Sequence, residues 1–208
     1  MKKRMDKLVN EIKVSKKMLL FLFVLGLIAI IVGTIFVIVL KDSDQILVEK
    51  YLASFFNKIK NNNLNYIYAL KNVSINNYFF ILAIWLLGIS IVGIPIIIFG
   101  YFMKCFVLGF SLTSILLNYK FKGIILSFIY IFPHHVINFL IYIVLISYSL
   151  TVSLKLIDAI IKKKNINFRL IINKYFLIFI LSFILITLTN LFEVYVTPLL
   201  IKYFINLT

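Results

Sequence analysis

Residues 18–40 read MLLFLFVLGLIAIIVGTIFVIVL, and this stretch decides the fold because it contains no charged residue. As an α-helix it would be roughly 34 Å long at 1.5 Å per residue, which matches the hydrocarbon thickness of a bilayer. A basic stretch precedes it, as in a secretory signal. The run is too long for a signal core, however, and no Ala-x-Ala-like cleavage site follows it. We therefore expect a retained first membrane span at Met18–Leu40.

The composition of the whole chain agrees with this expectation. Of the 208 residues, 63% are hydrophobic and 14% are charged, and the mean hydropathy is +1.09. A soluble domain has no interior large enough for so much apolar surface. The composition therefore excludes a soluble protein and predicts an all-α fold, a polytopic transmembrane helical bundle.

The net charge of +15 does not indicate a nucleic-acid partner, because the basic residues are not spread over a soluble surface. They gather at Met1–Lys17 and Lys155–Lys174, beside apolar runs, where they are typical of topology signals and contacts with anionic membrane lipid. The single cysteine, Cys105, excludes an intramolecular disulfide and a multi-cysteine metal site. We expect no cofactor and no metal.

Five spans are predicted, in a single transmembrane domain that covers residues 18–208. The predicted spans are Met18–Leu40, Tyr78–Met103, Cys105–Asn118, Ile124–Leu154 and 175–197. Between the first two lies a polar outer segment, residues 41–77. A cytoplasmic basic loop, residues 155–174, precedes the last span, and residues 1–17 form a cytoplasmic basic tail.

Cys105–Asn118 is the shortest of these runs, at roughly 21 Å as a helix. It would form either a tight span or a re-entrant hairpin with its neighbour. The distribution of basic residues favours the span. Five crossings place Met1–Lys17, Lys104 and Lys155–Lys174 on one side, with 14 of the 22 lysines and arginines. The positive-inside rule then puts the N-terminus inside and the C-terminus outside.

Small residues and helix breakers gather in the second and third predicted spans. Small faces allow helix backbones to approach closely in lipid, so a tightly packed bundle is favoured over a conduction pathway. Pro95 is predicted to kink its span, because proline removes one backbone hydrogen bond. The residues concerned are Gly88, Ser90, Gly93, Pro95, Gly100 and Gly109.

The outer segment contains an apolar stripe of one residue in every four, at Leu47, Tyr51, Phe55 and Ile59. This spacing predicts an amphipathic helix of about four turns that ends at the asparagines 61–63. The helix could lie on the membrane surface, pack on its own bundle, or offer a groove to a partner helix. Packing on the bundle is the default, and the four stripe residues are our candidates for partner binding.

Two histidines follow a proline in the fourth predicted span. Counted from Ile124, Pro133, His134 and His135 lie roughly in the middle of the membrane. Proline at this position leaves the carbonyl of Ile129 without its helical donor, and something nearby must satisfy it in lipid. A histidine N–H is a plausible donor, so the first interpretation of the pair is local repair of the kink.

Glu193 is the only charge between Tyr175 and Ile201, and a charge next to hydrocarbon is expensive. Counting along the last span places it near the outer boundary, where Tyr195 suits an interfacial position. Two interpretations remain open: an interhelical bond that locks the last span to the bundle, or an ordinary interfacial acid. Pro198 is expected to end or bend the helix. The predicted depths of His134 and Glu193 differ by about 10 Å, which argues against a shared site.

The membrane segments contain no catalytic constellation that we can identify. A metal site at the histidines would need a third ligand, and the sequence has no His-Glu-x-x-His, Ser-x-x-Lys or Gly-x-Ser-x-Gly motif. We therefore expect that the chain is not an enzyme. Proton-coupled transport through His134 and Glu193 is the alternative, although no internal repeat supports it.

Three segments together resemble the stage II sporulation protein M family of integral membrane proteins. They are the Pro133-His134 pair, Leu191–Pro198 with its Phe-Glu-x-Tyr-Val-x-Pro pattern, and Gly88–Pro95. Lys122–Phe128 resembles the sporulation branch. The broader family often carries Pro-His-Gly-x-x-Glu, and here His135 replaces the glycine and Asn138 the glutamate. This departure favours the sporulation branch, in which the motif is degenerate.

The resemblance implies a non-enzymatic role in endospore formation. Members of the sporulation branch anchor a septal complex with two wall-degrading partners, stage II sporulation proteins D and P. That complex remodels septal peptidoglycan during engulfment of the forespore. We accordingly expect a scaffold in the cell membrane, at the sporulation septum and in the engulfing mother-cell membrane. The resemblance leaves a small transporter or channel of the broader family as the alternative.

Overall fold

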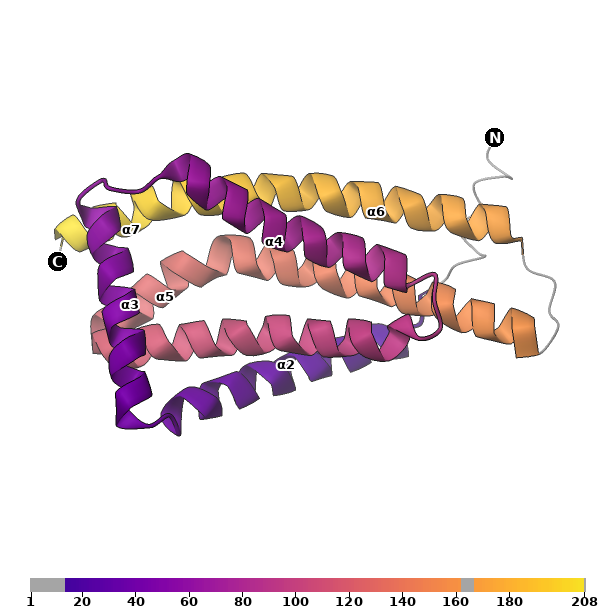
Figure 1. Cartoon of the computed structure of the whole chain (residues 1–208), viewed down its shortest axis with the longest axis horizontal. Helices are drawn as coiled ribbons and strands as arrows, with labels where there is room; N and C mark the ends of the chain where they lie inside the picture. Colours follow the sequence, from indigo (N-terminus) through magenta and orange to yellow (C-terminus); the bar gives the residue numbers. More distant parts are fainter. Residues whose placement is uncertain (1–13, 162–166, 208) are drawn as a thin grey trace.

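The computed structural model of the chain describes residues 14–161 and 167–207, and all its regular elements in these ranges are helical (Figure 1). Most run roughly parallel to one long axis, as a membrane bundle requires. The elements are α2 (Lys16–Ile38), α3 (Asp42–Lys60), α4 (Tyr66–Leu87), α5 (Gly93–Ile161), α6 (Phe168–Leu191), the π-helix η1 (Phe192–Val196) and α7 (Thr197–Leu207).

The predicted number of spans is confirmed. Five helical stretches are long and apolar enough to cross a membrane, namely Lys16–Ile38, Tyr66–Leu87, Gly93–Tyr130, Pro133–Ile161 and Phe168–Ile205. The all-α polytopic class is therefore correct. We call the two ends of the bundle the Gly88 end, where α2 and α6 begin, and the Lys120 end, where α3 and α7 lie (Figure 1).

The predicted second span, Tyr78–Met103, is wrong because the chain turns inside it. Helix α4 ends at Leu87 and α5 begins at Gly93, so α4 itself is the second span. The predicted outer segment 41–77 consequently contains only α3 and the first half of α4. The turn is as apolar as the two helices that it joins, and no charged residue marks it in the sequence. A side chain on Gly93 would collide with the carbonyl of Leu87, so this tight turn requires glycine.

Pro95 does not kink a span, contrary to the prediction. It lies in the first turn of α5, which begins at Gly93. The first backbone N–H groups of a helix have no partner within the helix, so a proline there removes no hydrogen bond.

Helix α5 folds back on itself at Lys120, whose φ of 49° and ψ of −125° lie outside the helical region. Its first arm covers residues 93–119 and its second arm covers 121–161. The short run Cys105–Asn118 is thus part of a complete crossing and not a re-entrant hairpin. Lys104 lies within the first arm and not in a cytoplasmic turn, so its place in the predicted topology was wrong.

The contact between α2 and the first arm of α5 is close enough to need glycine on both sides. A Cβ on Gly33 would meet the backbone of Phe106, and one on Gly109 would meet the backbone of Ile30. The hydroxyl of Thr113 donates to that of Thr34 over 3.0 Å. Van der Waals packing of this kind replaces the hydrophobic drive that is absent between helices in lipid.

Gly88 has a structural role at the C-terminus of α4. The Ser149 hydroxyl donates to the carbonyl of Ile84 over 3.1 Å, and the Tyr175 hydroxyl donates to the same carbonyl over 3.1 Å. Ser153 donates to the carbonyl of Gly88 over 2.7 Å. A Cβ on Gly88 would collide with the Ser149 and Tyr175 hydroxyls. Three side chains therefore satisfy the last carbonyls of α4, and glycine makes room for them.

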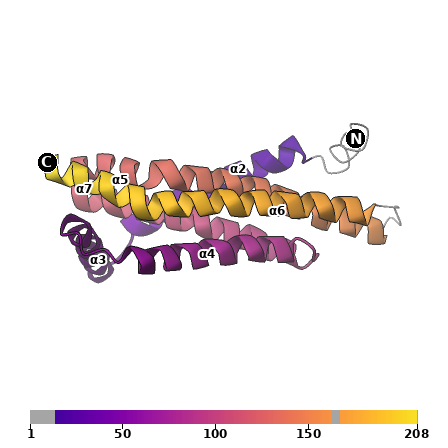
Figure 2. The same ribbon diagram turned by 90° about the horizontal axis from the view of Figure 1, so that it is seen from above.

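The predicted amphipathic helix exists as α3 and ends at Lys60, directly before the asparagine run that predicted its end. It lies across the Lys120 end of the bundle, and the 90° view shows α3 and α4 on one side of α5 and α6 (Figures 1 and 2). Phe56 and Ile59 are buried against α5 and α7. Leu47 and Tyr51 are 64% and 73% exposed. One part of α3 thus packs on its own bundle, and another part remains uncovered.

Candidate functional site

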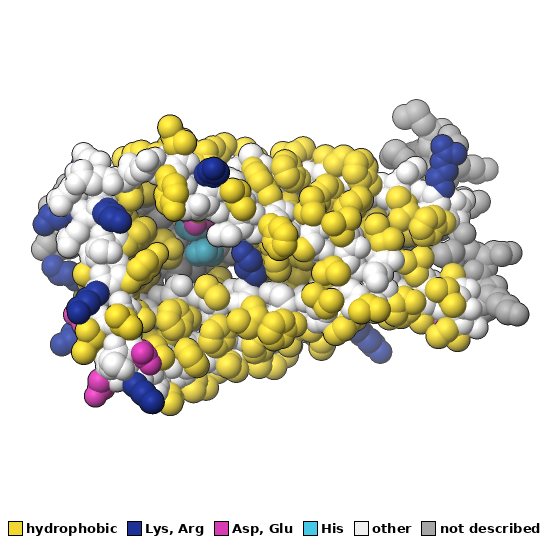
Figure 3. All heavy atoms as spheres, viewed as in Figure 1, with side chains coloured by type: hydrophobic (Ala, Val, Ile, Leu, Met, Phe, Trp, Pro, Cys, Tyr) yellow, Lys and Arg dark blue, Asp and Glu magenta, His cyan; other side chains and the backbone are white. Residues whose placement is uncertain are grey.

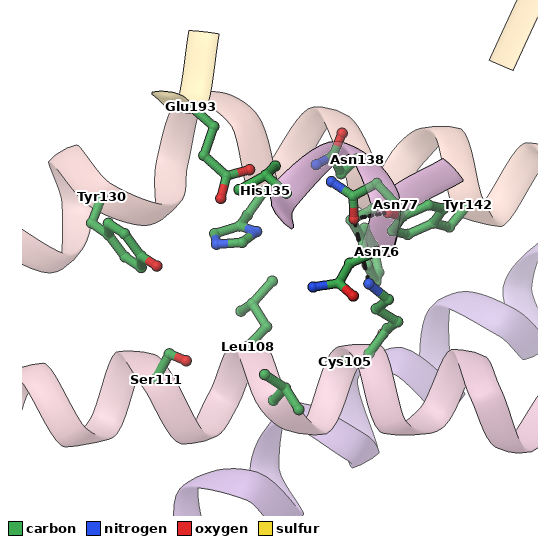
Figure 4. Close-up of a pocket in the computed structure, with 14 residues that line it drawn as sticks. Asn76, Asn77, Cys105, Leu108, Ser111, Tyr130, His135, Asn138, Tyr142 and Glu193 are labelled. Atoms are coloured by element: carbon green, nitrogen blue, oxygen red, sulfur yellow. Dashed lines mark hydrogen bonds between the residues drawn. The ribbon is translucent and has the colours of Figure 1, made fainter. Parts of the chain in front are cut away.

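A polar cavity of about 230 Å³ lies between α4, both arms of α5, and η1 (Figure 4). It is visible as a hollow on the flank of the molecule, where histidine and acidic side chains show between apolar ones (Figure 3). Its polar lining is unusual for a membrane bundle, since such groups are seldom kept near hydrocarbon without a partner or a task. The polar lining includes Asn76, Asn77, Lys104, Tyr130, His135, Asn138 and Glu193.

Asn77 of α4 makes the central hydrogen bonds at this cavity. Its amide Nδ2 donates to Oδ1 of Asn190 on α6 over 2.7 Å. Its Oδ1 accepts from the Tyr142 hydroxyl over 3.1 Å and from the Lys104 Nζ over 3.4 Å. One amide therefore connects α4, both arms of α5, and α6.

Lys104 is half-buried inside the bundle. Apart from its bond to Asn77, its Nζ lies 5.1 Å from the centre of the Phe80 ring. Both contacts suit a cation, since the amide oxygen is an acceptor and the face of an aromatic ring is negative. Neither contact neutralises the charge of the ammonium group.

Glu193 and His134 lie together, which the predicted difference in depth argued against. The Glu193 Oε2 is 3.8 Å from the His134 Nε2, and the two side chains are 18% and 0% exposed. The second nitrogen of the His134 ring, Nδ1, is 3.4 Å from the Thr197 hydroxyl. The interhelical interpretation of Glu193 thus fits the structure better than an interfacial acid.

The earlier depth estimate failed because both helices are longer than their apolar runs. The second arm of α5 begins immediately after Lys120, and the last span continues through α7 to Leu207. Measured from the Lys120 end, His134 and Glu193 are each roughly 20 Å along their helices. The two residues therefore lie at the same level, and His134 is not in the middle of its arm.

The π-helix η1 gives Glu193 its position. This segment, Phe192–Val196, interrupts the last span directly before Pro198. A proline cannot donate to the carbonyl four residues earlier and crowds it, and the wider π turn accommodates both effects. Of the two predicted outcomes, an end or a bend, the structure excludes the first: Pro198 does not end the helix, and α7 continues to Leu207. π-Bulges of this kind frequently occur at functional sites.

The histidines do not repair the helix at Pro133 in the way we expected. No hydrogen bond joins either ring to the carbonyl of Ile129 in the described part of the chain. The His134 ring is directed to Thr197 and Glu193, and His135 lines the polar cavity. The His134 Nε2 is buried and has no hydrogen-bond partner among the described residues.

Sequence reasoning missed three of the central residues, Asn77, Asn190 and Lys104. Asn77 was placed at the edge of the outer segment, and Lys104 was placed between the second and third spans, on the side of the N-terminus. A signal for Asn190 was available, since an asparagine within an apolar run needs a partner in lipid just as a charge does. Asn77 gave no such signal, because it ends the polar stretch 71–77. Within that run only Glu193 was expected to need a polar partner, so this signal was overlooked.

A second, apolar groove of about 330 Å³ lies between α3 and α5, and we call it the α3 groove. Three of the four stripe residues of α3, Leu47, Tyr51 and Phe55, line it, opposite Phe110 and Ile115 of α5. The fourth, Ile59, is buried in the bundle. Ser111 and Tyr130 line both the α3 groove and the polar cavity, so the two spaces are neighbours.

The chemistry available here is charge pairing and hydrogen bonding. Within residues 14–161 and 167–207, no group of three or more His, Cys, Asp or Glu side chains could hold a metal ion. The cavity instead offers one ammonium group, one carboxyl group, two imidazoles nearby and several amides.

Comparison with known proteins identifies a family. The family model described as Stage II sporulation protein M matches residues 18–198 of this chain. The comparisons with curated proteins and with solved structures found no match.

Proposed function

Because the chain belongs to the stage II sporulation protein M family, we propose that it is a non-enzymatic membrane scaffold in endospore formation. Family and fold make it a multi-pass membrane protein related to sporulation. In the proposed role it anchors wall-degrading partners, stage II sporulation proteins D and P, at the septum. Their remodelling of septal peptidoglycan then lets the mother-cell membrane engulf the forespore.

The observation that supports a scaffold is the uncovered part of α3. Leu47 and Tyr51 are exposed on a helix that lies across the Lys120 end of the bundle, while Phe56 and Ile59 hold the same helix in place. A rigid helix with apolar side chains left open is suited to bind a partner helix. We place this end outside the cytoplasm, where the wall lies, with the N-terminus inside. The basic stretches 1–17 and 155–174 favour that orientation.

Membrane-dye imaging of a deletion strain under sporulating conditions tests the role in the cell. The scaffold role predicts arrest with an unthinned or bulging septum and no engulfing membrane. Normal engulfment would contradict the scaffold role and would indicate that the chain has another function.

Co-purification of the two partners tests where they bind. Replacing the whole segment 41–77 would destroy the second span, so the change must be confined to α3. Leu47→Ser with Tyr51→Ser should abolish capture of the partners and leave membrane insertion intact. The matched control is Ile160→Ser with Ile161→Ser, since these residues are 68% and 73% exposed at the opposite end of the bundle. Unchanged capture by the α3 variant would place the contact within the spans.

A small transporter or channel is the second candidate. It is favoured by the 3.8 Å approach of His134 to Glu193 beside a polar cavity, because histidine and carboxyl groups form proton relays in membranes. This candidate predicts a pH-dependent flux in liposomes that Glu193→Gln or His134→Ala abolishes. A flux indifferent to both changes would count against it.

A further inference from the structure

We propose that the polar cavity binds a free α-amino acid, with its carboxylate at Lys104 and its ammonium group at Glu193. The ligand enters from the side of the Lys120 end, which we place outside the cytoplasm. The proposal goes beyond the scaffold role and does not depend on it, because it concerns a ligand of the bundle itself. It also leaves the α3 groove open for a protein partner.

The first argument is the depth of the cavity in the membrane. Lys17 lies beside Ile94 and Leu154 in a common groove, and a lysine at this position marks the membrane boundary at the Gly88 end. From this level, Lys104 is roughly 15 Å along the first arm of α5, at about half the hydrocarbon thickness. His135 is roughly 28 Å from Leu154 along the second arm, at the opposite boundary. The cavity therefore extends from the middle of the membrane to the boundary nearer the Lys120 end.

A soluble molecule can reach the cavity from that boundary. The second arm of α5 continues for roughly 20 Å between His135 and the turn at Lys120, so this part of the bundle lies beyond the hydrocarbon. The last span, Phe168–Ile205, contains 38 residues and is likewise longer than the hydrocarbon is thick. The hollow on the flank lies nearer the Lys120 end than the Gly88 end (Figure 3). A ligand dissolved in water can therefore enter without crossing lipid.

The second argument is the charge of the cavity. Lys104 on α5 and Glu193 on η1 line the same space with opposite charges, and in the described part of the chain they form no ion pair with each other. His134 lies 3.8 Å from Glu193, but it neutralises the carboxylate only when it is protonated. Charges near hydrocarbon are costly unless they are paired. A ligand that carries one negative and one positive group pairs both.

Neutral polar groups accompany both charges. Asn76 is directed into the cavity, and Tyr130 and His135 lie in the part of the cavity where Glu193 is found (Figure 4). Amide and hydroxyl groups donate hydrogen bonds to a carboxylate, and their oxygens accept hydrogen bonds from an ammonium group. The cavity can therefore hydrogen-bond both ends of an α-amino acid as well as neutralise them.

The third argument is the size of the cavity and its apolar lining. Pockets for drug-sized ligands measure roughly 300–1,000 Å³, whereas this cavity measures about 230 Å³ and suits a smaller molecule. Val73, Val107 and Leu108 line it together with the charged groups, and they can contact a small apolar side chain. An α-amino acid combines such a side chain with the two required charges. A simple carboxylate or amine would pair one charge of the cavity and leave the other without a counter-charge.

The test measures the binding of alanine to the full chain in nanodiscs by isothermal titration calorimetry. Two analogues each retain one of its charges, since propionate lacks the ammonium group and ethylamine lacks the carboxylate. We expect alanine to bind about tenfold more tightly than either analogue. Glycine and leucine are titrated in parallel. Equal affinities for alanine and propionate would overturn the proposal, and so would the absence of binding by all three amino acids.

Two variants assign the charges. In Lys104→Met, alanine should bind only as tightly as ethylamine, because the carboxylate of the ligand has lost its partner. In Glu193→Gln, alanine should bind only as tightly as propionate, for the corresponding reason. The controls are Lys58→Met and Glu49→Gln, which change exposed residues of α3 and should leave binding unchanged. General destabilisation would weaken propionate and ethylamine alike in both variants, and that result would overturn the assignment.

Thiol labelling in nanodiscs tests the access of water to the cavity. Cys105→Ser removes the single cysteine of the chain, and Asn76→Cys then places a thiol in the cavity. A water-soluble methanethiosulfonate reagent should modify this thiol, and bound alanine should slow the reaction. Phe79→Cys is the matched control, because Phe79 is 72% exposed on the same helix but does not line the cavity, so it should stay unmodified in lipid. An unreactive thiol at position 76 would overturn the proposal, since a soluble ligand could not reach Lys104.

Discussion

The first arm of α5 has two sides that are built differently. On the side of α2 its backbone lies against a neighbouring backbone, with Gly109 facing Ile30 and no room for a side chain. On the other side it faces the polar cavity with Lys104. Close contact between small residues stabilises helices in lipid, whereas polar groups with unused bonding capacity serve ligands or partners. The comparison teaches that a single helix carries close backbone packing on one side and charged and polar groups on the other, within a few residues of each other.

The largest effect is expected on the close-packed side. Gly109→Leu inserts a side chain where even a Cβ collides with the backbone of Ile30, so α2 must move away from α5. We expect a loss of about 3 kcal/mol or failure to assemble. Thermal unfolding in detergent, followed by fluorescence-detected gel filtration, measures this loss.

Gly100→Leu is the matched control for that change. The nearest atom to a Cβ on Gly100 is the Phe80 Cε2 at 3.3 Å, at the end of a side chain that can move. Its loss of stability should therefore be clearly smaller. If Gly100→Leu and Gly109→Leu lowered the stability equally, the contact of α5 with α2 would not be the main source of stability on this helix.

Asn77→Leu is the second change, on the cavity side. It removes the bonds to Asn190, Tyr142 and Lys104, and interhelical hydrogen bonds in membranes average about 0.6 kcal/mol each. We expect a loss of about 2 kcal/mol, measured in the same assay. Asn76→Leu is the control, because this neighbour is exposed and should change stability little. A loss equal to that of Gly109→Leu would contradict the separation of the two sides.

Glu193→Leu is the third change, with an expected loss of about 1 kcal/mol if the acid bonds across helices. If Glu193→Leu caused no loss of stability, the interpretation of Glu193 as an ordinary interfacial acid would be restored. A double-mutant cycle with His134→Ala separates the two outcomes. Pairing over 3.8 Å predicts that the combined loss is smaller than the two single losses together.

The apolar runs and the distribution of basic residues were sufficient to predict a helical bundle with five spans, because apolar length is a property of the local sequence. The bounds of the second and third spans were not predictable in the same way. The turn between α4 and α5 contains no charge, and its glycines were interpreted as packing residues within a span. A tight turn of this kind depends on contacts such as that of Gly93 with Leu87, which hydropathy does not register.

The site was only partly predictable. Glu193 and His134 were identified as candidates from their charge, but their proximity depends on where two long helices begin and end. Counting from the edges of apolar runs misplaced both residues. The role of Lys104 was hidden for the same reason, since a lone lysine between two apolar runs is typical of a turn. Its position beside Asn77 follows from the α5 hairpin, which requires the unusual backbone of Lys120.

The smallest effect on stability is expected from the exposed part of α3, and it extends the comparison to a second helix. Leu47→Ser with Tyr51→Ser changes side chains that make few contacts within the bundle, so stability should stay within about 0.5 kcal/mol. Phe56→Ser, one turn further on, opens a buried contact with α5 and α7 and should cost several times more. If Leu47 and Tyr51 were structural, both variants would unfold at similarly lowered temperatures. A stable double variant that no longer retains the partners would instead show that α3 uses one side for assembly and the other for binding.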